Sequence, residues 1–317
     1  MLEALAFFVL GLFLLALGGD SIVKGASGLA QRFGASPFVA GLLLVAFGTS
    51  LPELAVNARA IWTGSQALAL GNAVGSNIVN FGLTLGAAAL AAPLVVRWRA
   101  LSPLLLCFIA GSVAVIAFGL DGVLSRIEGA ILVVAFFAVL AFALVRTRRE
   151  APEVQDAIVA FVKTSNDLWL NLVRFVLAAV LLYFGARLVV AHAPPLGLAL
   201  GMEPMLTGLL VVAIGTALPE VAAAIAAARR GHGEMVVGHV IGSSLFNLLL
   251  IVGGMAAFAG ELALPASFVR FELPAALAFG IALYPMLKGD LRISKKEGGI
   301  LLVAFVAWLL FELWLSR

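Results

Sequence analysis

The chain has 317 residues, of which 63% are hydrophobic and only 12% are charged. A water-soluble globule of this composition would expose more apolar surface than it can hide, so the composition excludes a soluble domain and indicates a protein whose solvent is the lipid bilayer. The formal net charge of +3 does not indicate a nucleic-acid partner, because the basic residues form no single face or tail and fall in alternate loops.

Apolar runs long enough to cross a bilayer recur along the whole chain. A hydrocarbon core about 30 Å thick needs roughly 20 apolar residues per helix. The first run lacks a basic leader and continues through Gly18-Gly19-Asp20, so it is expected to stay in the mature chain. The sequence therefore predicts an all-α polytopic membrane protein with ten transmembrane helices, at residues 3–29, 37–62, 67–92, 101–119, 124–146, 169–193, 204–228, 234–259, 267–287 and 297–315.

The basic residues predict how these spans are oriented. Fifteen of the 20 lysines and arginines fall on one side of the ten-helix arrangement. By the positive-inside rule, that side is the cytoplasm, so the loop after the fifth span is cytoplasmic and both termini lie outside the cell membrane. The acidic stretch from Glu150 to Asp167 is expected to be a linker and nothing more.

The chain also matches itself, without a gap, at a fixed offset of 167 residues. Ala-Phe-Gly-Thr-Ser-Leu-Pro-Glu at 46–53 aligns with Ala-Ile-Gly-Thr-Ala-Leu-Pro-Glu at 213–220, and Gly-Asn-Ala-Val-Gly-Ser-Asn-Ile-Val-Asn at 71–80 aligns with Gly-His-Val-Ile-Gly-Ser-Ser-Leu-Phe-Asn at 238–247. Five spans per half is an odd number, so the halves are expected to be inverted, a pattern typical of secondary transporters with a midplane site. The predicted organisation is a first repeat at 1–147, a linker at 148–167 and a second repeat at 168–317.

Each half places one glutamate, Glu53 or Glu220, near the centre of a span. An uncompensated charge there costs at least about 2.5–3.5 kcal/mol, so something must offset it. One alternative is a carboxyl kept protonated or paired with a buried base, but the nearest basic residues, Arg59 and Arg229, lie far enough along to reach an interface. A bound cation is the preferred interpretation.

The neighbours of the two glutamates favour this cation interpretation. Thr49 and Thr216 each precede a glutamate by four residues, which places a hydroxyl on the same helical face. The proline before each glutamate has no amide hydrogen, so it deprives the carbonyl of Gly48 or Gly215 of its helical partner. In lipid, a freed carbonyl is tolerated where another group satisfies it, and a cation can do so.

The glycine-rich motif supplies further oxygen ligands. Ser76 and Asn80 are four residues apart, as are Ser243 and Asn247, so each pair presents side-chain oxygens in one direction. The glycines before them form small-xxx-small steps that permit close helix packing. Carboxylate, hydroxyl, amide and carbonyl oxygens without a thiolate suit a hard cation such as calcium or sodium.

These doubled motifs resemble those of the calcium/cation antiporter superfamily, in particular its prokaryotic sodium/calcium exchangers, over the whole chain. The resemblance implies an antiporter that exchanges calcium for sodium by alternating access, with discontinuous helices at the site and long first and sixth spans that slide across the bundle. It implies Glu53 and Glu220 as the principal ion ligands. The assisting ligands it implies are Thr49, Ser50, Ser76, Asn80, Thr216, Ser243 and Asn247, with the backbone carbonyls of Ala46 and Ala213. Beyond the transported ions and the bilayer, no cofactor, enzymatic chemistry or obligatory protein partner is expected.

The second half departs from the family pattern at four positions. They are Ala217 in place of serine, His239 and Ser244 in place of asparagine, and Asn247 where prokaryotic exchangers often carry aspartate. Two carboxylates balance one calcium ion or two monovalent ions, so three sodium ions would leave one charge unbalanced. Coupling to protons or another monovalent cation therefore stays open, as does a passive cation channel. His239, Ser243 and Asn247 are spaced by four, so the imidazole of His239 could face the site and carry a proton. The preferred interpretation is a histidine near the membrane interface without a role in coupling.

Overall fold

The computed structural model describes residues 1–317 apart from 34–49, 98, 151, 162, 290 and 316–317. Within the described residues, nine helical segments have the length and composition to cross a membrane, and they coincide with nine of the ten predicted spans. The tenth, predicted at 37–62, lies partly outside the described residues, and its described part is α3, Leu51–Trp62. The nine segments are Leu2–Arg32, Gln66–Ala91, Leu101–Asp121, Arg126–Thr147, Leu168–Ala199, Pro204–Arg229, Gly233–Phe258, Ala266–Lys288 and Lys295–Leu315.

Three of these segments change helical geometry partway along, which the apolar pattern did not predict. Each contains a π-helical stretch inside or beside a repeated motif, and π turns inside α-helices frequently occur at functional sites. In the first half the parts are α4 (Gln66–Val79), η2 (Asn80–Thr84) and α5 (Leu85–Ala91). In the second half they are α10 (Pro204–Leu206), η4 (Thr207–Val212) and α11 (Ala213–Arg229), followed by α12 (Gly233–Leu245), η5 (Phe246–Val252) and α13 (Gly253–Ala259).

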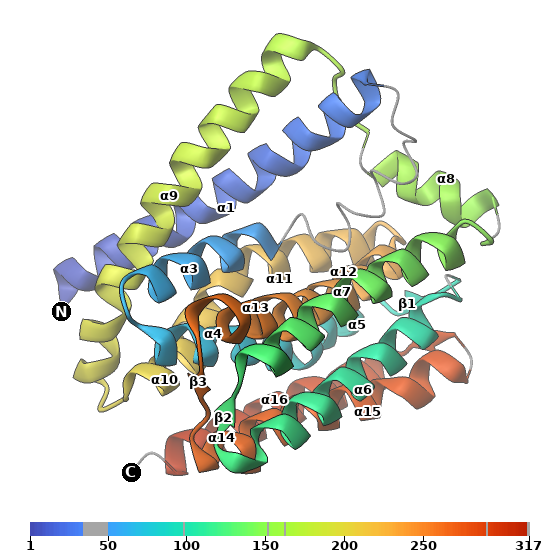
Figure 1. The fold of residues 1–317 in the computed structure, drawn as a ribbon. Helices are drawn as coiled ribbons and strands as arrows, with labels where there is room; N and C mark the ends of the chain where they lie inside the picture. Colours follow the sequence, from blue (N-terminus) through green and yellow to red (C-terminus); the bar gives the residue numbers. More distant parts are fainter. Residues whose placement is uncertain (34–49, 98, 151, 162, 290, 316–317) are drawn as a thin grey trace.

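The two segments that carry the glycine-rich motifs form the centre of the bundle (Figure 1). Their most apolar windows are 83% and 89% buried, against 22–44% for the other seven segments. α4 packs directly on α10 and η4. A side chain on Gly71 would collide with the carbonyl of Met205 in α10, and one on Gly75 with the carbonyl of Leu209 in η4. The close packing predicted for the first-half glycines is therefore present, and it joins the two halves of the sequence.

α1 (Leu2–Arg32) and α9 (Leu168–Ala199) lie side by side and cross the rest of the bundle at a tilt (Figure 1). Small residues permit this contact: a Cβ atom on Gly11 would lie 2.9 Å from Leu188, and one on Gly18 would lie 2.9 Å from Leu182. Only 28% of the apolar window of either helix is buried, so much of the pair's apolar surface faces outward.

Two short antiparallel ribbons join the outer helices of the two halves, and apolar periodicity did not predict them. β1 (Leu94–Val95) pairs with β4 (Arg292–Ile293), and β2 (Val123–Leu124) pairs with β3 (Leu262–Ala263). The remaining outer elements are α6 (Leu101–Phe118), η3 (Gly119–Asp121), α7 (Arg126–Thr147), α14 (Ala266–Arg270), α15 (Glu272–Lys288) and α16 (Lys295–Leu315).

The same order of elements recurs in the two halves of the chain. α4, α5, β1 and α7 are followed about 167 residues later by α12, α13, β3 and α16. The equivalence extends to details, because α7 and α16 both begin with a capping box. The hydroxyl of Ser125 accepts from the Glu128 amide, and the hydroxyl of Ser294 accepts from the Glu297 amide.

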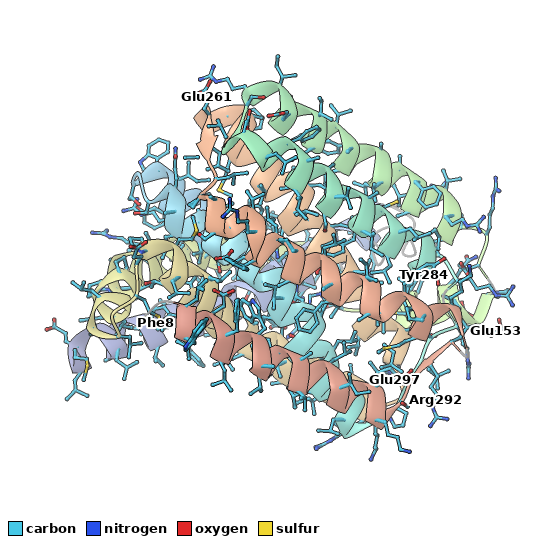
Figure 2. All side chains as sticks on the ribbon, turned by 90° about the horizontal axis from the view of Figure 1, so that it is seen from below. Phe8, Glu153, Glu261, Tyr284, Arg292 and Glu297 are labelled. Atoms are coloured by element: carbon cyan, nitrogen blue, oxygen red, sulfur yellow. The ribbon has the colours of Figure 1, made fainter. Side chains whose placement is uncertain are left out.

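The segment expected to be only a linker contains a further helix, α8 (Pro152–Phe161). Val154 and Ile158 are 2% and 0% exposed, so this helix packs onto the protein, and the expectation of a simple linker was wrong. α8 lies at the opposite end of the molecule from the start of α1 and the end of α16 (Figure 1). Figure 2 shows Glu153 of α8 at the same end as Arg292 and Glu297, with Glu261 at the other end.

Candidate cation-binding site

The structure brings the two motif glutamates together. Glu53 is the third residue of α3 and is 2% exposed, whereas Glu220 lies in the middle of α11 with a side chain that is 10% exposed. The two carboxylates are close enough to interact electrostatically. Within the described part of the chain, neither forms an ion pair with a lysine or an arginine.

A buried hydrogen-bond network links the motifs of the two halves. The Ser50 hydroxyl donates to Oγ of Ser243 over 2.8 Å, and Nδ2 of Asn80 donates to the same oxygen over 3.1 Å. All three side chains are 2% exposed or less. Two first-half residues and one second-half residue expected in the site therefore lie in direct contact.

Several other oxygens expected in the site are buried without a hydrogen-bond partner among the described residues. They are Oε2 of Glu53, Oγ of Ser76 and Oδ1 of Asn247. Leaving a polar group unpaired in an apolar interior costs about 1–3 kcal/mol, so natural proteins rarely do so without a reason. A set of acceptor oxygens that face no internal donor fits a hard cation as substrate.

Of the remaining expected ligands, some already take part in hydrogen bonds within their helix and others lie outside the described residues. The Thr216 hydroxyl donates to the carbonyls of Val212, at 3.0 Å, and Ala213, at 3.3 Å, so its lone pairs stay available while the Ala213 carbonyl already accepts one bond. Thr49 and the Ala46 carbonyl, together with Gly48, lie outside the described residues.

Pro52 and Pro219 occupy different helical positions. Pro52 lies in the first turn of α3, where its missing amide hydrogen leaves no gap in the helix, whereas Pro219 lies inside α11. Its missing amide hydrogen removes the usual helical donor to the Gly215 carbonyl, as predicted, so the interruption near Glu220 is part of the helix itself.

His239 lies against Glu220, which agrees with the alternative of an imidazole that faces the site and differs from the preferred interpretation of a histidine without a role there. Its Nε2 is 3.3 Å from Oε2 of Glu220, and the two side chains are 12% and 10% exposed. The repeat explains the difference: the equivalent residue, Asn72, donates through Nδ2 to Oδ1 of Asn57 over 3.0 Å. The second half carries Ala224 at the position of Asn57, so position 239 has no such amide to contact.

Sequence reasoning did not single out Asn77, a buried polar residue next to the expected ligand Ser76. Asn77 is fully buried, and neither atom of its amide has a hydrogen-bond partner among the described residues. Its repeat equivalent, Ser244, is also fully buried with its hydroxyl unpartnered in the same sense. The signal was present in the glycine-rich motif, where Asn77 directly follows Ser76.

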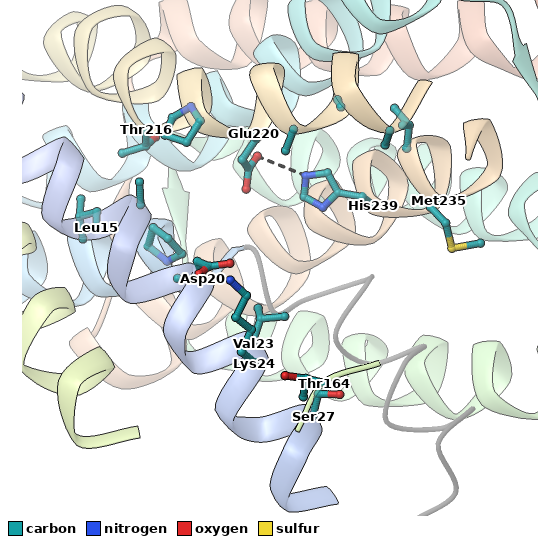
Figure 3. A pocket seen from close by; sticks show the side chains of 18 of the residues that line it. Leu15, Asp20, Val23, Lys24, Ser27, Thr164, Thr216, Glu220, Met235 and His239 are labelled. Atoms are coloured by element: carbon teal, nitrogen blue, oxygen red, sulfur yellow. Dashed lines mark hydrogen bonds and ion pairs between the residues drawn. The ribbon is translucent and has the colours of Figure 1, made fainter. Parts of the chain in front are cut away.

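A cavity of about 410 Å³ connects the site with one end of the molecule (Figure 3). Thr216, Glu220 and His239 line one wall, and α1 contributes the facing wall. Lys163 and Thr164, just after α8, line the far end. Glu220 is therefore reachable through the cavity from the α8 end, whereas Glu53 is not among the cavity-lining residues.

Comparison with known proteins identifies relatives over nearly the whole chain. The family model described as sodium/calcium exchanger protein matches residues 3–145 and again residues 170–314. The putative antiporter CaxA of Alkalimonas amylolytica is 34% identical over 313 residues, covering 97% of this chain and 98% of the relative. The sodium/calcium exchanger MaX1 of Methanosarcina acetivorans is 29% identical, covering 95% of this chain and 96% of the relative.

Solved structures agree with these sequence matches. A structure of the sodium-calcium exchanger NCX_Mj, soaked with sodium and strontium, superposes with a TM-score of 0.68 at 29% identity and covers 98% of both chains. The likeness therefore extends from the motifs to the arrangement of the helices.

Proposed function

The chain belongs to the sodium/calcium exchanger family, and from that membership and the geometry of its site we propose that it is a secondary active antiporter that exchanges calcium for sodium. The observation that carries the proposal is the pairing of Glu53 and Glu220, two buried carboxylates from different halves that interact with each other and with no lysine or arginine of the described chain. Two adjacent buried carboxylates are stable in their ionised form only with a counter-charge, and a transported cation would supply it.

Glu53 and Glu220 are the principal ligands in this proposal. Hydroxyl and amide oxygens complete the cage, and the same oxygens hold calcium and sodium at different times. The proposed assisting ligands are Thr49, Ser50, Ser76, Asn80, Thr216, Ser243 and Asn247, with the carbonyls of Ala46 and Ala213. Two carboxylates neutralise one divalent ion, which favours calcium as the ion bound with full charge balance.

The proposed architecture is ten transmembrane helices in two inverted repeats, 1–147 and 168–317, joined by the segment at 148–167. The recurring order of elements supports it, as does the double match of one family model to 3–145 and 170–314. The proposed orientation in the cell membrane places α8 in the cytoplasm and both termini outside, because most basic residues fall on the α8 side of the predicted spans.

Alternating access is proposed to involve a sliding motion of α1 and α9. Their mutual contact through glycines, together with the limited burial of both helices, supports movement of the pair as a unit. α1 also forms one wall of the cavity that reaches Glu220, so its displacement would close that route. The conformation described here is then the one open towards α8.

The second candidate keeps the fold but couples calcium to protons. The contact between His239 and Glu220 favours it, because it places an imidazole, a group able to carry a proton, against a proposed ligand. In both versions the protein is a cation antiporter, and the difference lies in the counter-ion.

Purified protein in sealed proteoliposomes tests these alternatives. Calcium uptake is measured with an outward sodium gradient, with a pH gradient in sodium-free buffer, and with neither. Sodium-driven uptake is the expected result, and uptake driven only by the pH gradient would select the proton version. Rapid uptake that needs no counter-ion would contradict exchange and indicate a passive channel. The Glu53→Gln/Glu220→Gln protein provides the background.

A further inference from the structure

The cavity beside the site contains an acidic residue that the ion-binding motifs do not include. Among the described residues that line it, the acidic side chains are Glu220 and Asp20, and the basic ones are Lys24 and Lys163. Figure 3 shows Asp20 and Lys24 on α1, across the cavity from Glu220 and His239. Asp20 therefore lies on the wall facing Glu220, on the route between that residue and the α8 end.

Asp20 is held by a weak interaction. Nζ of Lys24 lies 2.7 Å from Oδ2 of Asp20, and the two side chains are 51% and 58% exposed. An exposed ion pair between residues four apart on one helix contributes little stability, so an arriving cation can compete with the lysine for the carboxylate.

The position of Asp20 on α1 ties it to the proposed mechanism. The preceding residue, Gly19, contacts the first-half motif directly, because a Cβ atom at this position would lie 2.9 Å from the Pro52 ring. Most other lining residues are apolar or small, including Leu15, Ala16 and Val23 on α1 and Ala223 and Ala227 on α11. In a passage lined by so few charges, a single carboxylate raises the local concentration of cations.

We propose that Asp20 is the first anionic contact for a cation that enters the cavity from the α8 end, and that the cation displaces Lys24 from it before reaching Glu220. This inference rests on the proposed exchange function and assigns a recruiting residue to one of its two access routes. Asp20 raises the rate at which cations reach the site and does not belong to the final ligand cage.

The repeat predicts that recruitment of cations by Asp20 acts on one side of the membrane only. The residue 167 positions after Asp20 is Arg187, so α9 carries a positive charge at the position where α1 carries a negative one. If the halves are inverted, α9 lines the opposite access route, and that route lacks an equivalent carboxylate. Removal of Asp20 is therefore expected to affect cations from the α8 side and leave the other side unchanged.

Sided kinetics test the proposal. The α8 side is identified by labelling Glu153→Cys with an impermeant maleimide in a Cys107→Ser background. Asp20→Asn is expected to raise the KM for calcium presented on that side by about 3- to 10-fold, because loss of the carboxylate leaves Lys24 and Lys163 to repel cations. The maximal rate and the KM on the opposite side stay as in the wild type. Lys24→Gln is expected to lower the α8-side KM by about 2-fold.

The dependence of KM on ionic strength distinguishes an electrostatic role of Asp20 in recruiting cations from a structural role. Choline chloride is expected to raise the wild-type KM on the α8 side, because salt screens the attraction between the Asp20 carboxylate and the arriving cation. The effect on Asp20→Asn is expected to be smaller, because the mutation has already removed that attraction. Arg187→Gln is the matched control, which removes a charge at the equivalent position of α9 and leaves the α8-side KM unchanged.

Three outcomes would overturn the inference: an unchanged α8-side KM in Asp20→Asn, an equal change on both sides, or the same salt dependence in mutant and wild type. The calcium association rate of the purified protein, followed by stopped-flow tryptophan fluorescence, tests the role of Asp20 even if exchange is not observed. In Asp20→Asn this rate is expected to fall about 3- to 10-fold relative to the wild type. Absent exchange with a slowed association rate would refute the proposed function alone.

Discussion

The surroundings of Glu53 and Glu220 differ although the same motif supplies both residues. Glu53 is almost fully buried and does not line the cavity, and the nearby amides of Asn57 and Asn72 bond to each other. Glu220 lines the cavity and contacts His239. The comparison teaches that a duplicated motif can keep its two glutamates while substitutions around it leave one carboxylate sealed and the other accessible from the cavity.

The largest expected effect comes from neutralising either carboxylate. Glu53→Gln and Glu220→Gln each remove one of the two charges that hold the cation in the proposed site, and loss of one member of a buried charge pair costs about 2–5 kcal/mol. Exchange is therefore expected to fall at least about 30-fold in each variant, measured as calcium flux in proteoliposomes. Size-exclusion profiles and unfolding temperatures control for folding. Near-normal transport by either variant would show that only one half binds the ion.

The next effect concerns stability in the sealed half. Asn57→Ala removes the acceptor of the buried Asn72 amide, and an unsatisfied buried donor costs about 1–3 kcal/mol. A lower thermal unfolding temperature is expected, with the calcium KM little changed. The double variant Asn57→Ala/Asn72→Ala is expected to lose less stability than the two single variants added together, because it leaves no orphaned partner. Strict additivity would mean that the two asparagines do not interact.

The ion preference is expected to respond to a third carboxylate. Asn247→Asp places a charge where the present amide has no hydrogen-bond partner among the described residues, whereas the equivalent Asn80 is already bonded to Ser243. Sodium affinity is expected to change about tenfold, or roughly 1.4 kcal/mol, and calcium affinity less, because the extra charge balances a further monovalent ion. Competition between sodium and calcium measures this. Asn80→Asp is the comparison variant, and an equal response from both would remove the distinction between the halves.

Most of the fold was predictable because lipid leaves the chain few options. Backbone groups in a bilayer must be satisfied within a helix, so length and apolarity locate the spans, and nine of ten were found in the described residues. The π segments were not predictable, since a shift of one residue in hydrogen-bond partner barely alters apolar periodicity. The ribbons contain two residues per strand, and α8 contains ten residues, so both are too short for a periodic signal.

The site was predictable where it depends on residues within one motif. Glu53 interacts with Glu220, and Ser50 and Asn80 both donate to Ser243, so residues of the two motifs approach each other across the halves. Their role as ion ligands stays a prediction. The spacing of the motif left open that His239 faces the site. Its contact with Glu220 in particular was not predicted, because it depends on what stands at position 224, fifteen residues earlier in the chain and on another helix. Comparison of Asn57 with its repeat equivalent, Ala224, was the signal that would have revealed it.

The smallest expected effect concerns His239 and bears most directly on the difference between the halves. His239→Asn restores the residue found in the first half and removes the mostly buried contact with Glu220, whose net contribution is about 0.5–1 kcal/mol. Because the ion no longer competes with the imidazole for this carboxylate, the calcium KM is expected to fall about 2- to 5-fold at fixed pH while the maximal rate stays similar.

His239→Asn/Ala224→Asn sharpens this test, because it rebuilds the asparagine pair of the first half and should keep the lowered KM while recovering any lost stability. His232→Asn, in the turn before α12, is the matched control and is expected to leave the KM unchanged. If His239→Asn instead raises the KM, the imidazole orients Glu220 for the ion. The accessible half would then depend on its histidine as a positioning group.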